Sequence, residues 1–140
     1  MPTTALAFDY GLKNIGVAYG QSVTGHAQEL KALGAKDGIP DWQQIEALLN
    51  EWKPNIIIVG LPLNMDDSES ELCARAKKFA RRIHGRFAVQ VELMDERLST
   101  FDAKQEAKAR GHKGNYREQP IDSIAARLIL ESWFSSQHDH

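Results

Sequence analysis

Three acidic residues of this chain stand where a metal-dependent reaction could use them. Asp9 ends an apolar, strand-like segment and precedes a glycine turn. Glu96 follows the strand-like run 89–94, and Asp122 opens the C-terminal amphipathic segment. An ionised carboxylate in an apolar setting is unfavourable unless a cation, hydrogen bonds or protonation compensates. We therefore predict that Asp9, Glu96 and Asp122 converge on divalent metal.

The other potential metal ligands of the chain form no recognisable pattern. Cys73 is the only cysteine, which excludes an intramolecular disulfide and a thiolate cluster for zinc. The five histidines lack paired metal-ligand spacing. A site built from carboxylates favours Mg²⁺ or Mn²⁺, which keep several water ligands and bind substrate phosphates alongside one or two carboxylates.

Each carboxylate also has an ordinary structural explanation. Asp9 can accept hydrogen bonds from amides of the following turn, and Asp122 is favourable near a helix N-terminus. Glu96 can pair with Arg97 or with a basic residue of a helix. Only the combination of the three favours a metal site, and Asp95 leaves open which of two adjacent carboxylates faces the metal.

The elements that must hold these residues follow from the hydrophobic pattern. Strands are expected at 4–10, 15–21, 26–33, 55–60 and 89–94, and helices at 41–52, 68–84, 101–110 and from 120 onward. This order predicts an α/β fold with a mixed five-stranded sheet, three antiparallel strands followed by parallel strands, and helices on both faces. The first strand is expected to be central, with the ligand site beyond the carboxyl ends of the parallel strands.

Composition predicts one domain over residues 1–140. A chain of 140 residues that is 42% hydrophobic can bury one core and leaves little room for a second. The N-terminus does not have the pattern of a secretory leader, and the longest apolar stretch, 56–63, is shorter than a membrane span. We expect a soluble, cytoplasmic protein with no membrane partner.

Charge is divided unevenly along the chain. The net charge is −2, yet residues 75–117 hold 12 basic and 5 acidic side chains. One basic group forms a stripe along the expected helix 68–84, made of Arg75, Lys78, Arg82 and Arg86. A second group follows, made of Lys104, Lys108, Arg110, His112, Lys113 and Arg117. One such stripe is often only the solvated face of a helix. The second group leads directly to Asp122, and a basic segment beside a carboxylate site favours a polyanionic substrate.

Four sequence blocks together carry a family resemblance. They cover residues 8–18, 59–64, 95–100 and 122–126, in that order along nearly the whole chain. In these blocks the chain resembles the YqgF/RuvX family. The chain departs from the family pattern at Asn14, where a basic residue is more usual, and at Asp66-Asp67, where Asp-Gly is more usual.

The resemblance implies a fold, an activity and partners. It implies an RNase H-like fold and a divalent-metal site carried by Asp9, Glu96 and Asp122. The implied activity is that of a nuclease, a hydrolase that matures the 5′ end of pre-16S rRNA in ribosome biogenesis. Members are also described as Holliday junction resolvases, so branched DNA is the alternative substrate. Ribosome-associated proteins are further expected partners.

Phosphodiester cleavage assigns a role to each residue. Two metal ions about 4 Å apart can position the water, neutralise the phosphate and stabilise the leaving oxygen. We expect Asp9 to bridge the ions, with Glu96 and Asp122 completing the two coordination shells. Lys13 or Arg97 is expected to contact the scissile or a neighbouring phosphate. The substrate-binding surface is expected to extend over Arg75, Lys78, Arg82 and Lys113.

Two other classes of function stay open at this stage. Asp-x-Gly between two strands also resembles the first phosphate loop of actin-like ATPases, although those enzymes enclose the nucleotide between two such domains. The chain could also be a non-catalytic nucleic-acid adaptor. RNA versus DNA, endonucleolytic versus exonucleolytic action, and monomer versus dimer are likewise left undecided by the sequence.

Overall fold

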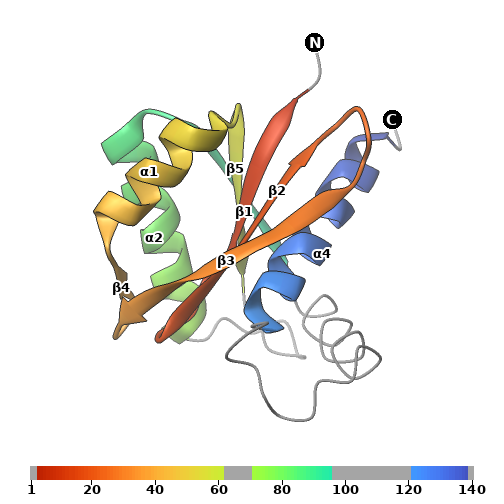
Figure 1. The fold of residues 1–140 in the computed structure, drawn as a ribbon. Coiled ribbons are helices and arrows are strands. Elements are labelled where there is room, and N and C mark those ends of the chain that lie inside the picture. The colour runs from red at the N-terminus through yellow and green to blue at the C-terminus, as the bar shows by residue number, and fades with distance from the viewer. Residues whose placement is uncertain (1–2, 62–70, 96–120, 139–140) are drawn as a thin grey trace.

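The computed structural model describes residues 3–61, 71–95 and 121–138. The six strands are β1 (Thr4–Asp9), β2 (Asn14–Gln21), β3 (Ala27–Lys36), β4 (Ile39–Pro40), β5 (Ile56–Leu61) and β6 (Gln90–Asp95). The helices are α1 (Trp42–Trp52), α2 (Glu71–Phe87) and α4 (Ile121–His138). Figure 1 shows α1 and α2 on one side of the sheet and α4 on the other, so the prediction of helices on both faces is confirmed.

The strands form one mixed sheet in the order β4-β3-β2-β1-β5-β6. β1 pairs antiparallel with β2 and parallel with β5, and β5 pairs parallel with β6. β1 therefore lies in the interior of the sheet, as expected from the sequence. Its carboxyl end points to the same edge as those of β5 and β6.

The predicted count of five strands is wrong, because β4 adds a sixth. Asp37 and Gly38 have φ values of 50° and 81°, and they reverse the chain so that Ile39 and Pro40 pair with the end of β3. Positive φ at two successive turn residues is the geometry that Asp-Gly favours in tight hairpins. A two-residue strand is too short to show the alternation by which strands are recognised.

The described helices agree with the predictions except at their ends. Asp41 caps α1 by accepting a hydrogen bond from the Gln43 amide at 3.0 Å, and Lys53 ends the helix in the left-handed region. α2 continues to Phe87 rather than 84, where Ala88 adopts a φ of 53°. The expected start of α2 at 68–70 and the expected helix 101–110 lie outside the described residues. No helix in the described ranges is long and apolar enough to cross a membrane.

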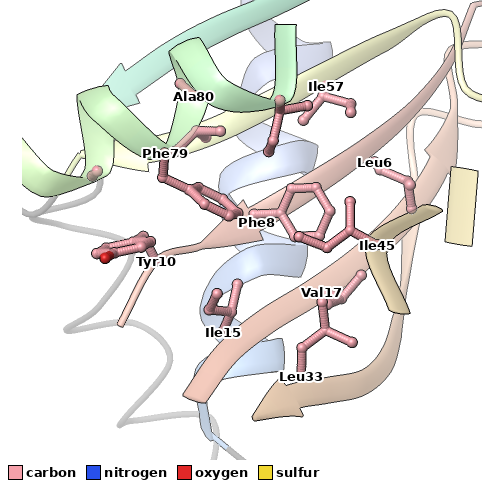
Figure 2. Packing of buried hydrophobic residues seen from close by; sticks show 13 residues of the cluster. Leu6, Phe8, Tyr10, Ile15, Val17, Leu33, Ile45, Ile57, Phe79 and Ala80 are labelled. Atoms are coloured by element: carbon pink, nitrogen blue, oxygen red, sulfur yellow. The ribbon is translucent and has the colours of Figure 1, made fainter. Parts of the chain in front are cut away.

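Alternation along β1 divides the core between the two faces of the sheet. Leu6, Phe8 and Tyr10 point toward α1 and α2, where Phe8 meets Phe79 of α2 with ring centroids 5.7 Å apart (Figure 2). The smaller Ala5 and Ala7 point the other way and are buried against α4. Small side chains on this face allow a helix to pack close to the central strand.

Candidate functional site

Asp9 is the last residue of β1, and among the described side chains it is the only charged one that is buried. Its side chain is 9% exposed, and by alternation with Ala7 it belongs to the α4 face. Its cross-strand neighbours are Gly16 on β2 and Gly60 on β5. Since directly opposed residues share a face, neither neighbouring strand places a side chain beside the Asp9 carboxylate.

The register of β5 and β6 brings a second acidic segment to the same edge. Gly60 pairs with Met94, and Leu61 pairs with Asp95, which ends β6. β5 lies between β1 and β6, so these two strands are about 10 Å apart. Glu96 comes directly after Asp95 and lies outside the described part of the chain.

The first turn of α4 is fixed to the sheet by Ser123. This side chain is 2% exposed, and its Oγ donates a hydrogen bond to the Leu30 carbonyl at 2.8 Å. The same oxygen accepts a hydrogen bond from the Val17 amide at 3.4 Å. The β2–β3 register shifts between Ile15 and Val17, and such a bulge leaves backbone groups without a ladder partner. Ser123 satisfies two of those groups, which ties the start of α4 to this irregularity.

Asp122 immediately precedes Ser123 and is the second residue of α4. Val17, which Ser123 contacts, pairs with Phe8 on β1, one residue before Asp9. The backbone of α4 therefore begins beside the carboxyl end of β1, at the lower end of Figure 1 and away from both termini. The side chain of Asp122 is outside what the structure describes.

Polar contacts hold the rest of α4 against the strands. Arg127 donates to Glu29 of β3 and to Glu131, both at 2.9 Å, and Glu131 accepts the Ala27 amide at 3.2 Å. Toward the opposite edge of the sheet, on the same α4 face, Trp133 Nε1 donates a hydrogen bond to the Glu92 carboxylate of β6 at 2.6 Å. Because α4 contacts both β3 and β6, its position relative to β1 is defined by several independent contacts.

The predicted basic stripe on α2 lies on the face opposite to that of Asp9. Arg75, Lys78 and Arg82 line a cavity of about 200 Å³ together with Tyr10 and the turn between β3 and β4. Arg75 is paired with Asp37, with Nη1 3.1 Å from Oδ1. At the end of the helix, the Arg86 guanidinium stacks over Trp42 at 4.4 Å from the ring centre. Arg86 thus contacts the protein itself.

Two more predicted substrate-binding residues cannot be compared with the structure, because Arg97 and Lys113 fall outside the described residues. Lys13 is exposed in the turn after β1, and its carbonyl accepts a hydrogen bond from the Ala35 amide at 2.8 Å. It lines a second surface cavity with Lys36 and Gln44. Lys13 is therefore near the same edge of the sheet as Asp9.

The described residues alone do not contain a group of three acidic, histidine or cysteine side chains that could hold a metal ion. Of the three predicted ligands, Asp9 alone has a described side chain. The three-carboxylate site thus stays a prediction. Sequence reasoning did not identify Ser123, Gly16 or Gly60 as part of the site. For Ser123, the signal in the sequence was a polar residue next to Asp122 in an otherwise apolar segment.

Comparisons with known proteins cover nearly the whole chain. Residues 3–136 match the model of the family described as RuvX: Holliday junction resolvase. A protein of Saccharophagus degradans is 64% identical over 131 residues, which are 94% of this chain and 92% of that protein. A protein of Pseudomonas putida is 58% identical over 132 residues, 94% of each chain. Both carry the name "Putative pre-16S rRNA nuclease".

Solved structures share the fold at low sequence identity. RuvC of T. thermophilus in complex with a Holliday junction substrate superposes with a TM-score of 0.59 and 14% identity, covering 97% of this chain and 96% of that one. The yeast mitochondrial Holliday junction resolvase has a TM-score of 0.57 and 12% identity, covering 96% and 78%. These likenesses establish the RuvC-like RNase H fold that the sequence predicts.

Proposed function

The chain belongs to the RuvX family, and on this premise we propose that it is a metal-dependent nuclease that processes the 5′ end of pre-16S rRNA. The observation that carries the proposal is Asp9, a buried carboxylate at the carboxyl end of an interior strand. A glycine lies opposite it on each of the two adjacent strands. The names of the relatives from Saccharophagus and Pseudomonas support rRNA as the substrate. Ribosome-associated proteins are proposed as further partners.

The proposed catalytic and metal-binding residues are Asp9, Glu96 and Asp122. The start of α4 beside the end of β1 supports the inclusion of Asp122, because Ser123 holds that turn against β2 and β3. Alternation supports Glu96 over Asp95. Glu92 accepts a hydrogen bond from Trp133 of α4, and Met94 packs against the cluster that contains α4 residues. Glu96 continues this series of every second residue, whereas Asp95 does not.

The described surroundings of Asp9 fit a hard cation. Carboxylate oxygen is the ligand that Mg²⁺ and Mn²⁺ prefer, and the two opposed glycines add no side chain beside it from β2 or β5. Bound as a pair, these ions supply Lewis acidity and an activated water for an in-line displacement. Asp9 would hold its oxygens toward the α4 face, and the tertiary contacts of α4 would keep Asp122 within reach of the same point.

Substrate binding is proposed to involve Lys13, Arg97, Arg75, Lys78, Arg82 and Lys113. Lys13 and the three α2 residues stand near the edge of the sheet at which β1 ends. Phosphate contacts of this kind position a nucleic acid without reading its sequence. The described cations would therefore orient the strand, while the carboxylates act on one phosphodiester.

The test compares wild type with Asp9→Asn on end-labelled pre-16S leader RNA, with Mg²⁺ or Mn²⁺ and with chelator. Asp41→Asn is the matched control, because it makes the same chemical change at an exposed α1 cap where asparagine serves equally well. With metal, we expect wild type and Asp41→Asn to cleave the RNA. With chelator, we expect no cleavage by either. Asp9→Asn should cleave almost nothing while it still binds the RNA. Equal cleavage by Asp9→Asn would overturn the catalytic assignment.

A second candidate function is resolution of branched DNA. The family description and the fold shared with RuvC favour it. A four-way DNA junction in the same assay separates the two activities, since preferential cutting of the junction would replace rRNA processing as the function. Binding of both substrates without cleavage of either would instead identify a nucleic-acid adaptor.

A further inference from the structure

The cavity of about 200 Å³ on the α1/α2 side has a charged rim and an aromatic wall. Its cations are Arg75, Lys78 and Arg82, which are three and four residues apart and so lie on one side of α2. Its aromatic wall is formed by Tyr10, Trp42 and Phe79. The turn between β3 and β4 closes the remaining side.

The rim carries excess positive charge. Asp37 is the one carboxylate among the described residues that line the cavity, and Arg75 already pairs with it. Lys78 and Arg82 are exposed, and no ion pair joins either of them to another described residue. Like charges four residues apart on a helix destabilise it slightly, so this pair favours an anion between its members. A phosphodiester, which carries one negative charge, would offset part of this excess.

The aromatic wall strengthens that attraction rather than competing with it. Tyr10 donates its hydroxyl hydrogen to the Gly38 carbonyl at 2.8 Å, and its ring packs on Phe79 at 5.1 Å (Figure 2). A wall of low polarity beside exposed cations raises the local potential felt by an anion.

The cavity and Asp9 lie on opposite faces of the same edge of the sheet. Tyr10 follows Asp9 directly, and its ring points to α2 whereas Asp9 belongs to the α4 face. A phosphate in the cavity is therefore not the one attacked beside Asp9. The volume is sufficient for a phosphate group with its hydration but is small for a stacked nucleotide.

We propose that this cavity binds a single phosphate group of the nucleic-acid strand, one other than the phosphate attacked beside Asp9. The proposal rests on the proposed function for the identity of the strand, but the phosphate site itself does not require cleavage. Arg75 would be held in place by Asp37, while Lys78 and Arg82 supply the direct contacts. Bidentate Arg82 would fix the orientation of the phosphate, and Lys78 would act as a point charge.

Phosphate binding can be measured without catalysis in the Asp9→Asn protein. Inorganic phosphate is titrated, and amide chemical shifts of Gly38 and Tyr10 report occupancy. Arg82→Ala should weaken binding about two- to fivefold, the range expected for one exposed charge contact. Arg81→Ala is the matched control, since Arg81 is an exposed neighbour on α2 that does not line the cavity. Equal weakening by both variants would overturn the site in favour of general attraction.

Asp37→Asn gives a second test with the opposite sign. Asn tolerates the φ of 50° at this position and can still accept a hydrogen bond from Arg75. Removal of the negative charge should tighten phosphate binding about two- to fivefold. Unchanged or weaker binding by Asp37→Asn would contradict the electrostatic argument.

Two further arms identify the source of the phosphate. Adenosine monophosphate should shift the same amides and adenosine should not, which shows that the phosphate group is recognised. A single-stranded RNA should displace inorganic phosphate from the cavity, and failure to do so would overturn the nucleic-acid source in favour of a free nucleotide. Cleavage that persists in the absence of phosphate binding rejects this inference alone, whereas phosphate binding without cleavage rejects only the proposed function.

Discussion

Replacement of Ser123 by alanine should destabilise the protein far more than removal of one exposed hydroxyl. The Ser123 hydroxyl is bonded to the Leu30 carbonyl at 2.8 Å and to the Val17 amide at 3.4 Å, and the side chain is 2% exposed. A buried backbone group that loses its partner costs about 1–3 kcal/mol. Because the Val17 contact is long, we place each loss at the lower end and expect the free energy of unfolding to fall by about 2–3 kcal/mol.

Urea denaturation followed by tryptophan fluorescence measures this change. The slope of the transition should not change, because the variant exposes the same surface on unfolding. A loss of that size corresponds to a fall of roughly 7–10 °C in Tm for a domain of this length. Ser135→Ala is the matched control, since Ser135 is an exposed residue of the same helix and should change stability by less than about 0.5 kcal/mol.

The same variant also tests whether Ser123 positions the proposed metal site. If the first turn of α4 is held only by this hydroxyl, Ser123→Ala should require more Mg²⁺ for half-maximal thermal stabilisation, and Ser135→Ala should not. A stability loss of Ser123→Ala no larger than that of the control would refute the reasoning. It would mean that the bulge between β2 and β3 finds other partners for its backbone groups.

Three further predictions concern space, pH and metal. Gly20→Ala should lower the free energy of unfolding by about 1–3 kcal/mol in chemical denaturation, because its Cβ would lie 2.7 Å from the His26 carbonyl oxygen. Gly34→Ala, which meets no atom within 4 Å, is the control. Burial raises the pKa of Tyr10 in the folded state above its ordinary value of 10.0. The stability that the neutral phenol contributes is therefore complete below pH 10.0 and is lost as the pH rises through the pKa of the folded state. Wild type should then lose more stability than Tyr10→Phe in alkaline unfolding titrations. Mg²⁺ at 100 times its dissociation constant should stabilise wild type by about 2.7 kcal/mol in thermal unfolding, and a similar gain in Asp9→Asn would exclude Asp9 as a ligand.

The sequence was sufficient to identify the elements whose pattern is local. Alternation marks β1, a continuous β-branched run marks β5, and helical spacing marks α1 and the apolar face of α4. The family followed from four short blocks, and the match over residues 3–136 confirmed it. Asp9 could be recognised as unusual from its own neighbours, since an acidic residue after an apolar strand and before glycine is visible in the printed sequence.

The sequence did not reveal which side chains share a face. Helical spacing predicted the stripe of Arg75, Lys78 and Arg82 but not the face of the sheet it covers, and the structure places it with Tyr10 on the other side of the sheet from Asp9. The two-residue β4 was missed for a related reason, because a short strand is defined by its pairing partner and not by its own pattern.

The surroundings of Asp9 were decided by tertiary structure alone. Gly16 and Gly60 flank it only through the register of three strands, and Ser123 reaches Val17 across 106 positions of sequence. Residue type and local period are properties of short segments, so the sequence determined the strands, the helices and the candidate carboxylate. Register, face and the partners of buried polar groups depend on contacts between distant segments, and these exist only once the chain has folded.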